Sequence, residues 1–299
     1  MFRVLQGVAP ERAAAAAERL FFTPPHTRLS PELATVLERG KPFSIVAAGR
    51  RVSAWSWGDG PAVYLMHGWG SRGARLGSFV APLVCAGYRV VTHDAPGHGA
   101  SDPGTSSLPE FARALRALVE RVGPVHGVIA HSMGASATAL AMAHGLPVPR
   151  AVFLAPAANP AAFVDQFVAA LGLSATTRRR LQQRSERRLA FRWADLDVPT
   201  LAREFAAPLL VIHDREDRVV PWADGAAIAA AWPGAEMMTT TGLGHRDVVR
   251  APHVLARALA FITGRTTHPT TQVAALNEIA VLERELFERE QRCAAMLRL

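Results

Sequence analysis

The sequence predicts an α/β fold with a mostly parallel sheet, and three observations support this. Short apolar or β-branched runs alternate with longer helical patterns from Phe43 to about Gly264, as in chains of βαβ units. The chain has 299 residues, of which 49% are hydrophobic, so it can bury a substantial core. Its cysteines, Cys85 and Cys293, are far apart and outside any metal-ligand spacing. We therefore expect neither a disulfide framework nor a structural metal site.

Eight segments are strand candidates. The first two are expected to form a hairpin, and right-handed crossovers between the later ones would place helices on both faces of the sheet. The candidates are Phe43–Ala48, Val52–Trp57, Ala62–His67, Arg89–Asp94, Gly127–His131, Ala151–Ala155, Leu209–His213 and Glu236–Thr240. Helices are expected at Leu76–Ala86, Pro109–Val122, Met133–His144, Trp222–Trp232 and Val248–Ile262.

The alternation breaks once, between Pro156 and Leu201, where a long helical and basic stretch separates two strand candidates. An insertion of that length is usually a lid or a binding element. We therefore divide the chain into five parts. They are an N-terminal helical arm (1–40), a core in two pieces (41–156 and 200–264), a helical lid (157–199), and a linker with a C-terminal helix (265–299).

The segment after Thr271 has a narrow apolar stripe at three- and four-residue spacing, with charged residues beside it. Such a helix is marginal alone in water, so the stripe must bury against this chain's own core or a second subunit. Charged residues beside a narrow apolar stripe are typical of helices that pair with another helix, and closed two-fold dimers are the commonest soluble assembly. We predict a homodimer through this helix.

The formal net charge of +8 comes largely from arginine, and seven arginines lie between Arg178 and Arg192 with only Glu186 to offset them. A basic surface attracts nucleic acid, anionic lipid or acidic ligands. No nucleic-acid reading module accompanies these arginines, so we expect a solvated helix face and no nucleic-acid partner. We recognise neither a signal peptide nor an apolar run of membrane-spanning length, and we expect a cytoplasmic protein.

A nucleophile candidate lies in the string Ala130-His131-Ser132-Met133-Gly134, where a strand candidate meets a helix candidate. Reversing the chain in one residue strains the backbone of Ser132 and leaves room only for small residues two positions away. Gly134 meets this demand, and Ala130 adds one methyl group to the usual glycine. The alternative is an ordinary serine N-cap.

A serine hydroxyl needs a base within hydrogen-bond reach, and that base needs an acceptor for its second ring nitrogen. His245 follows the last strand candidate in the string Gly242-Leu243-Gly244-His245, where glycines leave the imidazole room to approach Ser132. The acceptor is Asp214 or Asp217, because both follow the strand candidate that ends at His213.

Stabilising the transition state needs two N–H donors aimed at the developing oxyanion. The Met133 amide is one, at the start of a helix whose dipole helps. The second is expected from Trp69, in the turn His67-Gly68-Trp69-Gly70 after a strand candidate.

With the segment Asp94-Ala95-Pro96-Gly97-His98-Gly99-Ala100-Ser101, these motifs resemble the α/β-hydrolase superfamily, esterase-like branch, from Phe43 to Gly264. The resemblance implies an eight-stranded sheet, a lid after the sixth strand, and hydrolysis through an acyl-enzyme without metal or organic cofactor. It also implies Asp217 as the acid, because the spacing Asp-x-Val-Val-Pro follows the acid in this fold. His67 and His98 are expected to be structural.

The leading hypothesis is a serine carboxylesterase acting on a small-molecule ester. Thioesterase, lactonase, amidase, perhydrolase and carbon–carbon bond hydrolase activities use the same machinery, so fold and triad cannot separate them. A non-catalytic binding protein on this scaffold typically loses a triad member, whereas every member has a candidate here. Phe163, Phe167 and Leu171, at helical spacing in the lid, are expected to face the pocket with Trp69 and Met133; ordinary packing on the core is the alternative.

Overall fold

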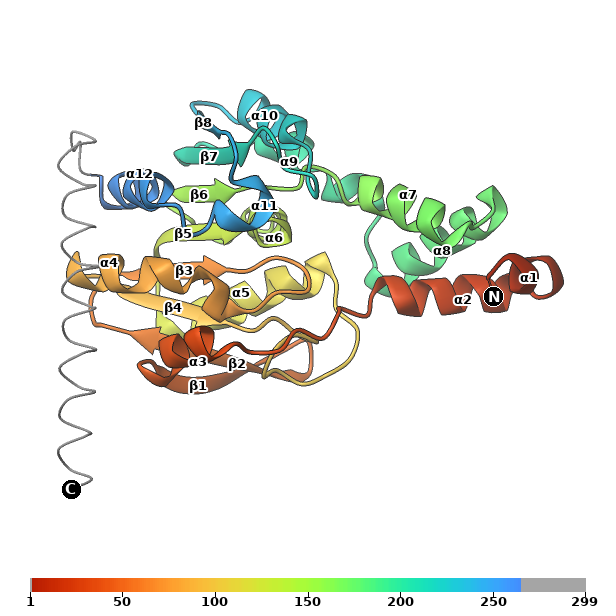
Figure 1. The fold of residues 1–299 in the computed structure, drawn as a ribbon, viewed down its shortest axis with the longest axis horizontal. Helices are drawn as coiled ribbons and strands as arrows, with labels where there is room; N and C mark the ends of the chain where they lie inside the picture. Colours follow the sequence, from red (N-terminus) through yellow and green to blue (C-terminus); the bar gives the residue numbers. More distant parts are fainter. Residues whose placement is uncertain (1, 265–299) are drawn as a thin grey trace, which may run out of the picture.

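The computed structural model describes residues 2–264 of the chain. Its centre is an eight-stranded sheet with the strand order β1-β2-β4-β3-β5-β6-β7-β8 (Figure 1). β1 pairs antiparallel with β2, and β2 pairs antiparallel with β4. Every later pair is parallel. The predicted eight-stranded, mostly parallel sheet is confirmed.

The strands match the predicted segments to within two residues at each end. They are β1 (Lys41–Ala47), β2 (Arg50–Trp57), β3 (Ala62–Met66), β4 (Arg89–His93), β5 (Val125–His131), β6 (Ala151–Leu154), β7 (Leu209–Asp214) and β8 (Glu236–Thr240). Every residue of β3, β6 and β7 is buried. Central strands covered on both faces require such continuous apolar runs.

Two predicted helices have different limits in the structure, in both cases near a proline. In place of one helix over Leu76–Ala86 there are a 3-10 helix, η1 (Gly73–Phe79), and a short α4 (Val80–Cys85), whose third residue is Pro82. The helix expected over Val248–Ile262 begins later, as α12 (Pro252–Thr263), and a separate short helix, α11 (Gly244–Asp247), precedes it. Proline has no N–H to donate, so it fits the first turn of a helix and disrupts later turns.

The other helices cover the sheet or form the insertion after β6. On the sheet lie α5 (Leu108–Val122), α6 (Met133–Ala143) and α10 (Trp222–Ala231), whereas α3 (Pro31–Glu38) lies on η1. The insertion contains α7 (Pro160–Leu171), α8 (Ala175–Leu189), η2 (Trp193–Leu196) and α9 (Val198–Ala202). Two apolar clusters fill the core, one shared with α5, α6 and α10 and the other with η1, α4 and α12. Helices thus cover both faces of the sheet.

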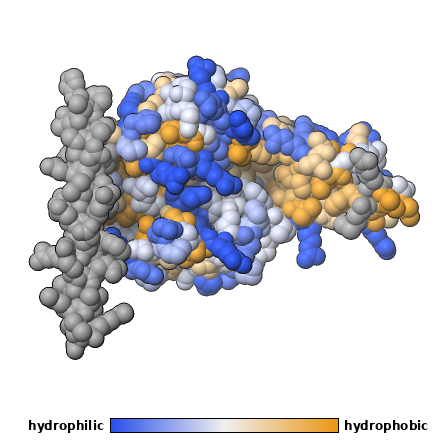
Figure 2. Space-filling model, in the orientation of Figure 1, coloured by the Kyte–Doolittle hydropathy of each residue, from blue (hydrophilic) through white to orange (hydrophobic). Residues whose placement is uncertain are grey.

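The N-terminal helices α1 (Phe2–Val8) and α2 (Pro10–Phe21) project from one end of the sheet beside α7 and α8 (Figure 1). Gln6 Nε2 donates to the carbonyl of Gly172 over 3.1 Å, which joins α1 to the end of α7. α3 instead packs against η1, where Val36 contacts Gly77. Apolar side chains gather on the projecting lobe, as Figure 2 shows.

Three of the six arginines of α8 pair with carboxylates, whereas we expected a solvated face. Arg184 pairs with Glu18 of α2 over 2.8 Å, and Glu18 is only 6% exposed. Further ion pairs are Arg178–Asp165, Arg180–Glu11 and Arg192–Asp195. The pairs with Glu11 and Glu18 hold α8 against α2.

The predicted linker and C-terminal helix (265–299), and the homodimer expected from them, lie outside the described residues. Within residues 2–264, no helix combines the length and the apolar character that crossing a membrane requires.

Candidate active site

The sharp strand-to-helix turn is present at Ser132, between β5 and α6. Ser132 has a φ of 53° and a ψ of −125°, a conformation that residues other than glycine rarely adopt. Its N–H donates to the carbonyl of Leu154 on β6 over 2.9 Å, which fixes the turn against the neighbouring strand. This geometry lifts the side chain clear of the sheet edge.

Two glycines allow this turn to pack closely against the chain that follows β3. A Cβ atom on Gly134 would lie 2.5 Å from the carbonyl oxygen of His67, and one on Gly68 would lie 2.9 Å from the Cβ of Ser132. Neither position accepts a side chain. Ala130 is fully buried in β5, so the sheet accommodates its extra methyl group.

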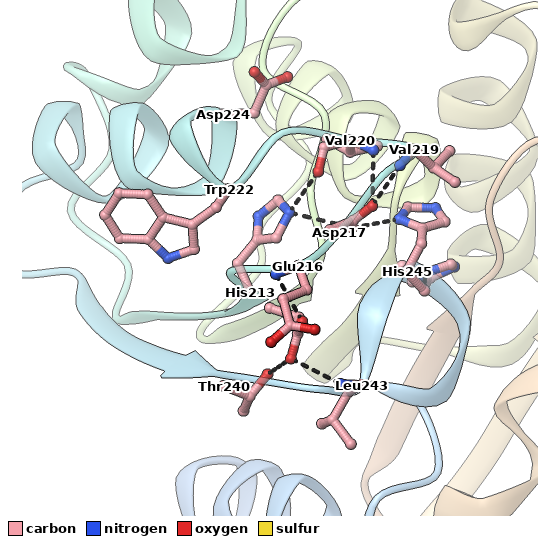
Figure 3. A network of polar contacts seen from close by, with 12 residues as sticks. His213, Glu216, Asp217, Val219, Val220, Trp222, Asp224, Thr240, Leu243 and His245 are labelled. Atoms are coloured by element: carbon pink, nitrogen blue, oxygen red, sulfur yellow. Dashed lines mark hydrogen bonds and ion pairs between the residues drawn. The ribbon is translucent and has the colours of Figure 1, made fainter.

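His245 and Asp217 are directly hydrogen-bonded. His245 Nδ1 lies 2.7 Å from Asp217 Oδ2 (Figure 3), and the Asp217 side chain is completely buried. The other carboxylate oxygen accepts the N–H groups of Val219 and Val220 over 2.8 and 2.9 Å. Because a carboxylate accepts, Nδ1 carries the proton, and Nε2 is left free to take one.

Asp217 remains ionised despite its burial. Burial raises the pKa of this carboxyl group, but hydrogen bonds from His213, His245 and the Val220 N–H together outweigh burial and hold the pKa below its ordinary value. His213 Nε2 lies 3.3 Å from the same oxygen that binds His245. A charged acceptor here stabilises an imidazolium on His245.

Asp214, the alternative acid, has a different set of partners. It accepts the Thr240 hydroxyl over 2.8 Å and the N–H groups of Glu216 and Leu243 over 2.9 and 3.1 Å. It therefore ties the end of β7 to the end of β8. The structure brings Asp217, and not Asp214, to His245.

Ser132 and His245 line one cavity of about 660 Å³. His131 Nε2 bonds the His245 carbonyl oxygen over 2.9 Å, which holds the His245 loop beside the serine turn. Among the described residues, no hydrogen bond joins the Ser132 hydroxyl to His245. Catalytic hydrogen bonds often tighten only when substrate binds.

Trp69 and Met133 line the same cavity, and neither backbone N–H bonds a protein group within the described chain. Two histidines hold the turn that contains Trp69. His67 Nδ1 lies 2.7 Å from the Gly68 carbonyl oxygen, and Nε2 accepts the Ala95 N–H over 2.9 Å. His98 Nε2 accepts the Gly70 N–H over 3.0 Å. Both histidines thus have structural partners.

The sequence pattern of the "Alpha/beta hydrolase family" matches residues 63–258. The chain belongs to this family. That span contains the serine turn, the acid loop and the His245 loop described above.

Three curated relatives of this hydrolase have different functions. The magnesium-chelatase 30 kDa subunit of Rhodobacter capsulatus is 36% identical over 122 residues, which span 37% of this chain and 42% of that protein. The 2-hydroxy-6-oxononadienedioate/2-hydroxy-6-oxononatrienedioate hydrolase 1 of Dechloromonas aromatica is 30% identical over 61% of this chain and 80% of its own. The pimeloyl-[acyl-carrier protein] methyl ester esterase of Xanthomonas campestris is 28% identical over 68% of this chain and 94% of that protein.

One similar solved structure covers 90% of this hydrolase and all of the other chain, with a TM-score of 0.59 and 21% identity. It is described as a membrane phospholipase A, a novel bacterial virulence factor. At this identity the likeness concerns the fold alone.

The insertion of this hydrolase supplies part of the cavity wall. Phe163, Val164 and Phe167 of α7 line the cavity with Trp69 and Met133, whereas Leu171 does not. Leu171 lies eight residues after Phe163, and at 100° per residue it is rotated about 80° away from that side of the helix. The prediction therefore fails at Leu171, the last residue of α7.

The N-terminal arm of the hydrolase also lines the cavity, next to α7, which the sequence analysis did not predict. Residues between Leu20 and Leu33 line the cavity. Phe21 packs edge-on against Phe167, with ring centroids 5.2 Å apart. The available signal was the apolar run Leu20-Phe21-Phe22 at the end of a helix, just before the Pro24-Pro25 break.

Four buried histidines lie around the site, and burial is the main reason that each has a lowered pKa. The pKa falls to about 3 for His93 and His131 and to about 4 for His98, and it is also well below the ordinary value for His67. Within residues 2–264, neither ring nitrogen of His93 has a hydrogen-bond partner. All four are neutral in the folded protein at pH 7.

We expect the folded state to lose stability as the pH falls below about 6.5. Below this pH the histidines bind protons in the unfolded chain but not at their buried positions in the folded protein. Each buried histidine therefore lowers the free energy of unfolding by about 1.4 kcal/mol per pH unit until its folded pKa is reached. Thermal unfolding midpoints between pH 7.5 and pH 5 measure this loss. His93→Leu should weaken the pH dependence, and the same change at exposed His253 should not. A midpoint independent of pH in the unmodified protein would contradict the assignment.

Proposed function

We propose that this chain is a serine hydrolase that cleaves carboxylic esters, with Ser132 as nucleophile, His245 as general base and Asp217 as the acid that orients it. The observation that carries the proposal is the 2.7 Å hydrogen bond between His245 and the buried Asp217. It lies at the cavity that also contains the strained Ser132.

The proposed reaction has two halves. His245 Nε2 takes the proton of Ser132 as its oxygen attacks the ester carbonyl, and the backbone N–H groups of Trp69 and Met133 stabilise the oxyanion. Collapse of the tetrahedral intermediate breaks the bond to the alcohol, which leaves with the proton from His245. Water then attacks the acyl-enzyme with the help of the same histidine, releasing the acid and restoring the serine.

An ester fits this site because the serine, the base and the two amides supply what acyl transfer to water requires. The printed name of the Xanthomonas campestris relative also specifies an ester substrate. Apolar side chains from α2 and α7 surround the cavity, so we assign them to the acyl chain. In this proposal, the insertion and the N-terminal helices act together as the lid over the serine.

A panel of substrates tests the reaction class. Purified enzyme is assayed with 4-nitrophenyl esters of increasing acyl length and with matched thioesters, lactones and amides, and heat-denatured enzyme provides the blank. We expect the esters to give the highest kcat/KM. If thioesters, lactones or amides were cleaved faster than esters, the enzyme would be assigned to that reaction class. No turnover of any substrate would contradict the proposed hydrolase.

Replacing Phe167 by alanine should shift the preferred acyl chain to longer esters, because the change removes a ring from the cavity wall beside Phe21. The measurement is kcat/KM across the 4-nitrophenyl ester series. Leu171→Ala is the matched control, since it shortens a side chain of the same helix outside the cavity wall, and it should leave the preference unchanged. Equal losses at all chain lengths in Phe167→Ala would indicate a purely structural role.

A further inference from the structure

In the part of the chain that the structure describes, the cavity wall carries four arginines and no acidic side chain. Among its lining residues the charged side chains are Arg28, Arg72, Arg75 and Arg246, and no aspartate or glutamate is present. Arg28, Arg75 and Arg246 are exposed at the rim, and no ion pair of the described chain includes any of the four. A partly enclosed cavity lined by one sign of charge concentrates ligands of the opposite sign.

Arg72 differs from the other three because it is buried, with 7% of its surface exposed. Its Nη2 donates to the carbonyl oxygen of Thr27. Its Nε is buried and has no partner, and no hydrogen bond within residues 2–264 uses Nη1. A buried guanidinium without a counter-ion is costly, because burial removes its hydration and no opposite charge replaces it.

Asp94 is close enough to Arg72 for the arginine charge to affect its pKa, but the two side chains form no ion pair. Burial raises the pKa of Asp94 above its ordinary value, although hydrogen bonds from the Ala100 and Gly73 N–H groups and the Arg72 charge act to lower it. The two carboxylate oxygens accept the N–H groups of Gly73 and Ala100, each over 2.8 Å. Asp94 therefore supports the backbone around Arg72 and does not pair with the guanidinium, which lines the cavity.

We propose that Arg72 binds a carboxylate group of the substrate, so that the preferred substrate is an ester carrying a second, anionic carboxylate. This inference rests on the proposed ester hydrolysis at Ser132. Arg72 lies three residues after Trp69, so the turn that supplies an oxyanion amide also supplies the anion site. The exposed arginines at the rim attract the anion, and Arg72 binds it inside the cavity.

The site should distinguish anionic from neutral esters because leaving Arg72 unpaired costs free energy. A neutral ester of the same shape fills the cavity but satisfies neither the charge nor the free donors of this side chain. Sites with buried polar groups reject ligands that lack the matching group. The free energy gained by pairing Arg72 is thus available only to the anionic substrate.

The test compares monomethyl adipate with the neutral ester in which its carboxylate is replaced by a carboxamide. We expect kcat/KM for the acid to exceed that for the amide by at least about tenfold, as one charge-assisted hydrogen bond provides. Arg72→Met should bring the ratio to about one, and Arg72→Lys should restore part of it. Arg75→Met should lower the ratio at about 0.01 M salt but not at about 1 M, where an exposed charge is screened.

Binding of adipate, measured calorimetrically in wild type and in Arg72→Met, separates this inference from the proposed function. Adipate binding that Arg72→Met removes, without ester turnover in wild type, would support the anion site and contradict the esterase. Cleavage of both esters at equal rates in wild type would contradict the anion site and leave the esterase intact. A ratio unchanged in Arg72→Met would also overturn the assignment of Arg72.

Discussion

Replacing Ser132 by alanine should lower kcat for ester hydrolysis by about a millionfold, the loss expected when the nucleophile of such a site is removed. The fold should be unaffected, because Ala48, Ala155 and Ala190 already adopt positive φ angles in this chain. The measurement is initial rate at saturating substrate, with circular dichroism as the check on folding.

Ser136 provides the matched control for that substitution. It lines the same cavity, but its hydroxyl donates to the Ala157 carbonyl oxygen over 2.6 Å. Ser136→Ala should therefore reduce stability modestly and leave most of the turnover. Comparable losses in the two variants would contradict the assignment of Ser132 as nucleophile.

Replacing Asp217 by asparagine should lower kcat by about 10⁴-fold with little change in fold. The amide keeps an acceptor for Val219 and Val220 but removes the charge that orients His245 and stabilises its protonated form. The measurement is kcat for the best ester of the panel.

Asp214→Asn is the contrasting variant, since Asp214 is a buried aspartate only three residues away, at the end of β7. Asp214 has three donors that join β7 to β8, so its substitution should lower the unfolding temperature more than it lowers kcat. If Asp214→Asn reduced kcat more than Asp217→Asn, the acid would be assigned to Asp214.

The sheet could be predicted closely because its strands are local patterns. β3, β6 and β7 are continuous apolar runs between turn residues, and their limits follow from the sequence to within a residue. Helix limits were less predictable near Pro82 and Pro252, where apolar periodicity continues across a residue that has no N–H to donate.

The candidate site was predictable where the residues lie in a strand-turn-helix context, as at Ser132, and less so where distant segments meet. The contact between Phe21 and Phe167 joins residues far apart in the sequence, so no local pattern indicates it. The same holds for Arg72 and His93. Both are ordinary residues in the sequence, and only tertiary burial shows that their polar atoms lack partners.

Covalent labelling tests the central claim most directly. The full-length protein is treated with a fluorophosphonate, digested and analysed by mass spectrometry, with residual esterase activity followed in parallel. The account predicts one phosphonate adduct, on Ser132, with activity lost in proportion to labelling. An active preparation whose Ser132 stays unmodified while activity is lost through an adduct at another residue would contradict it.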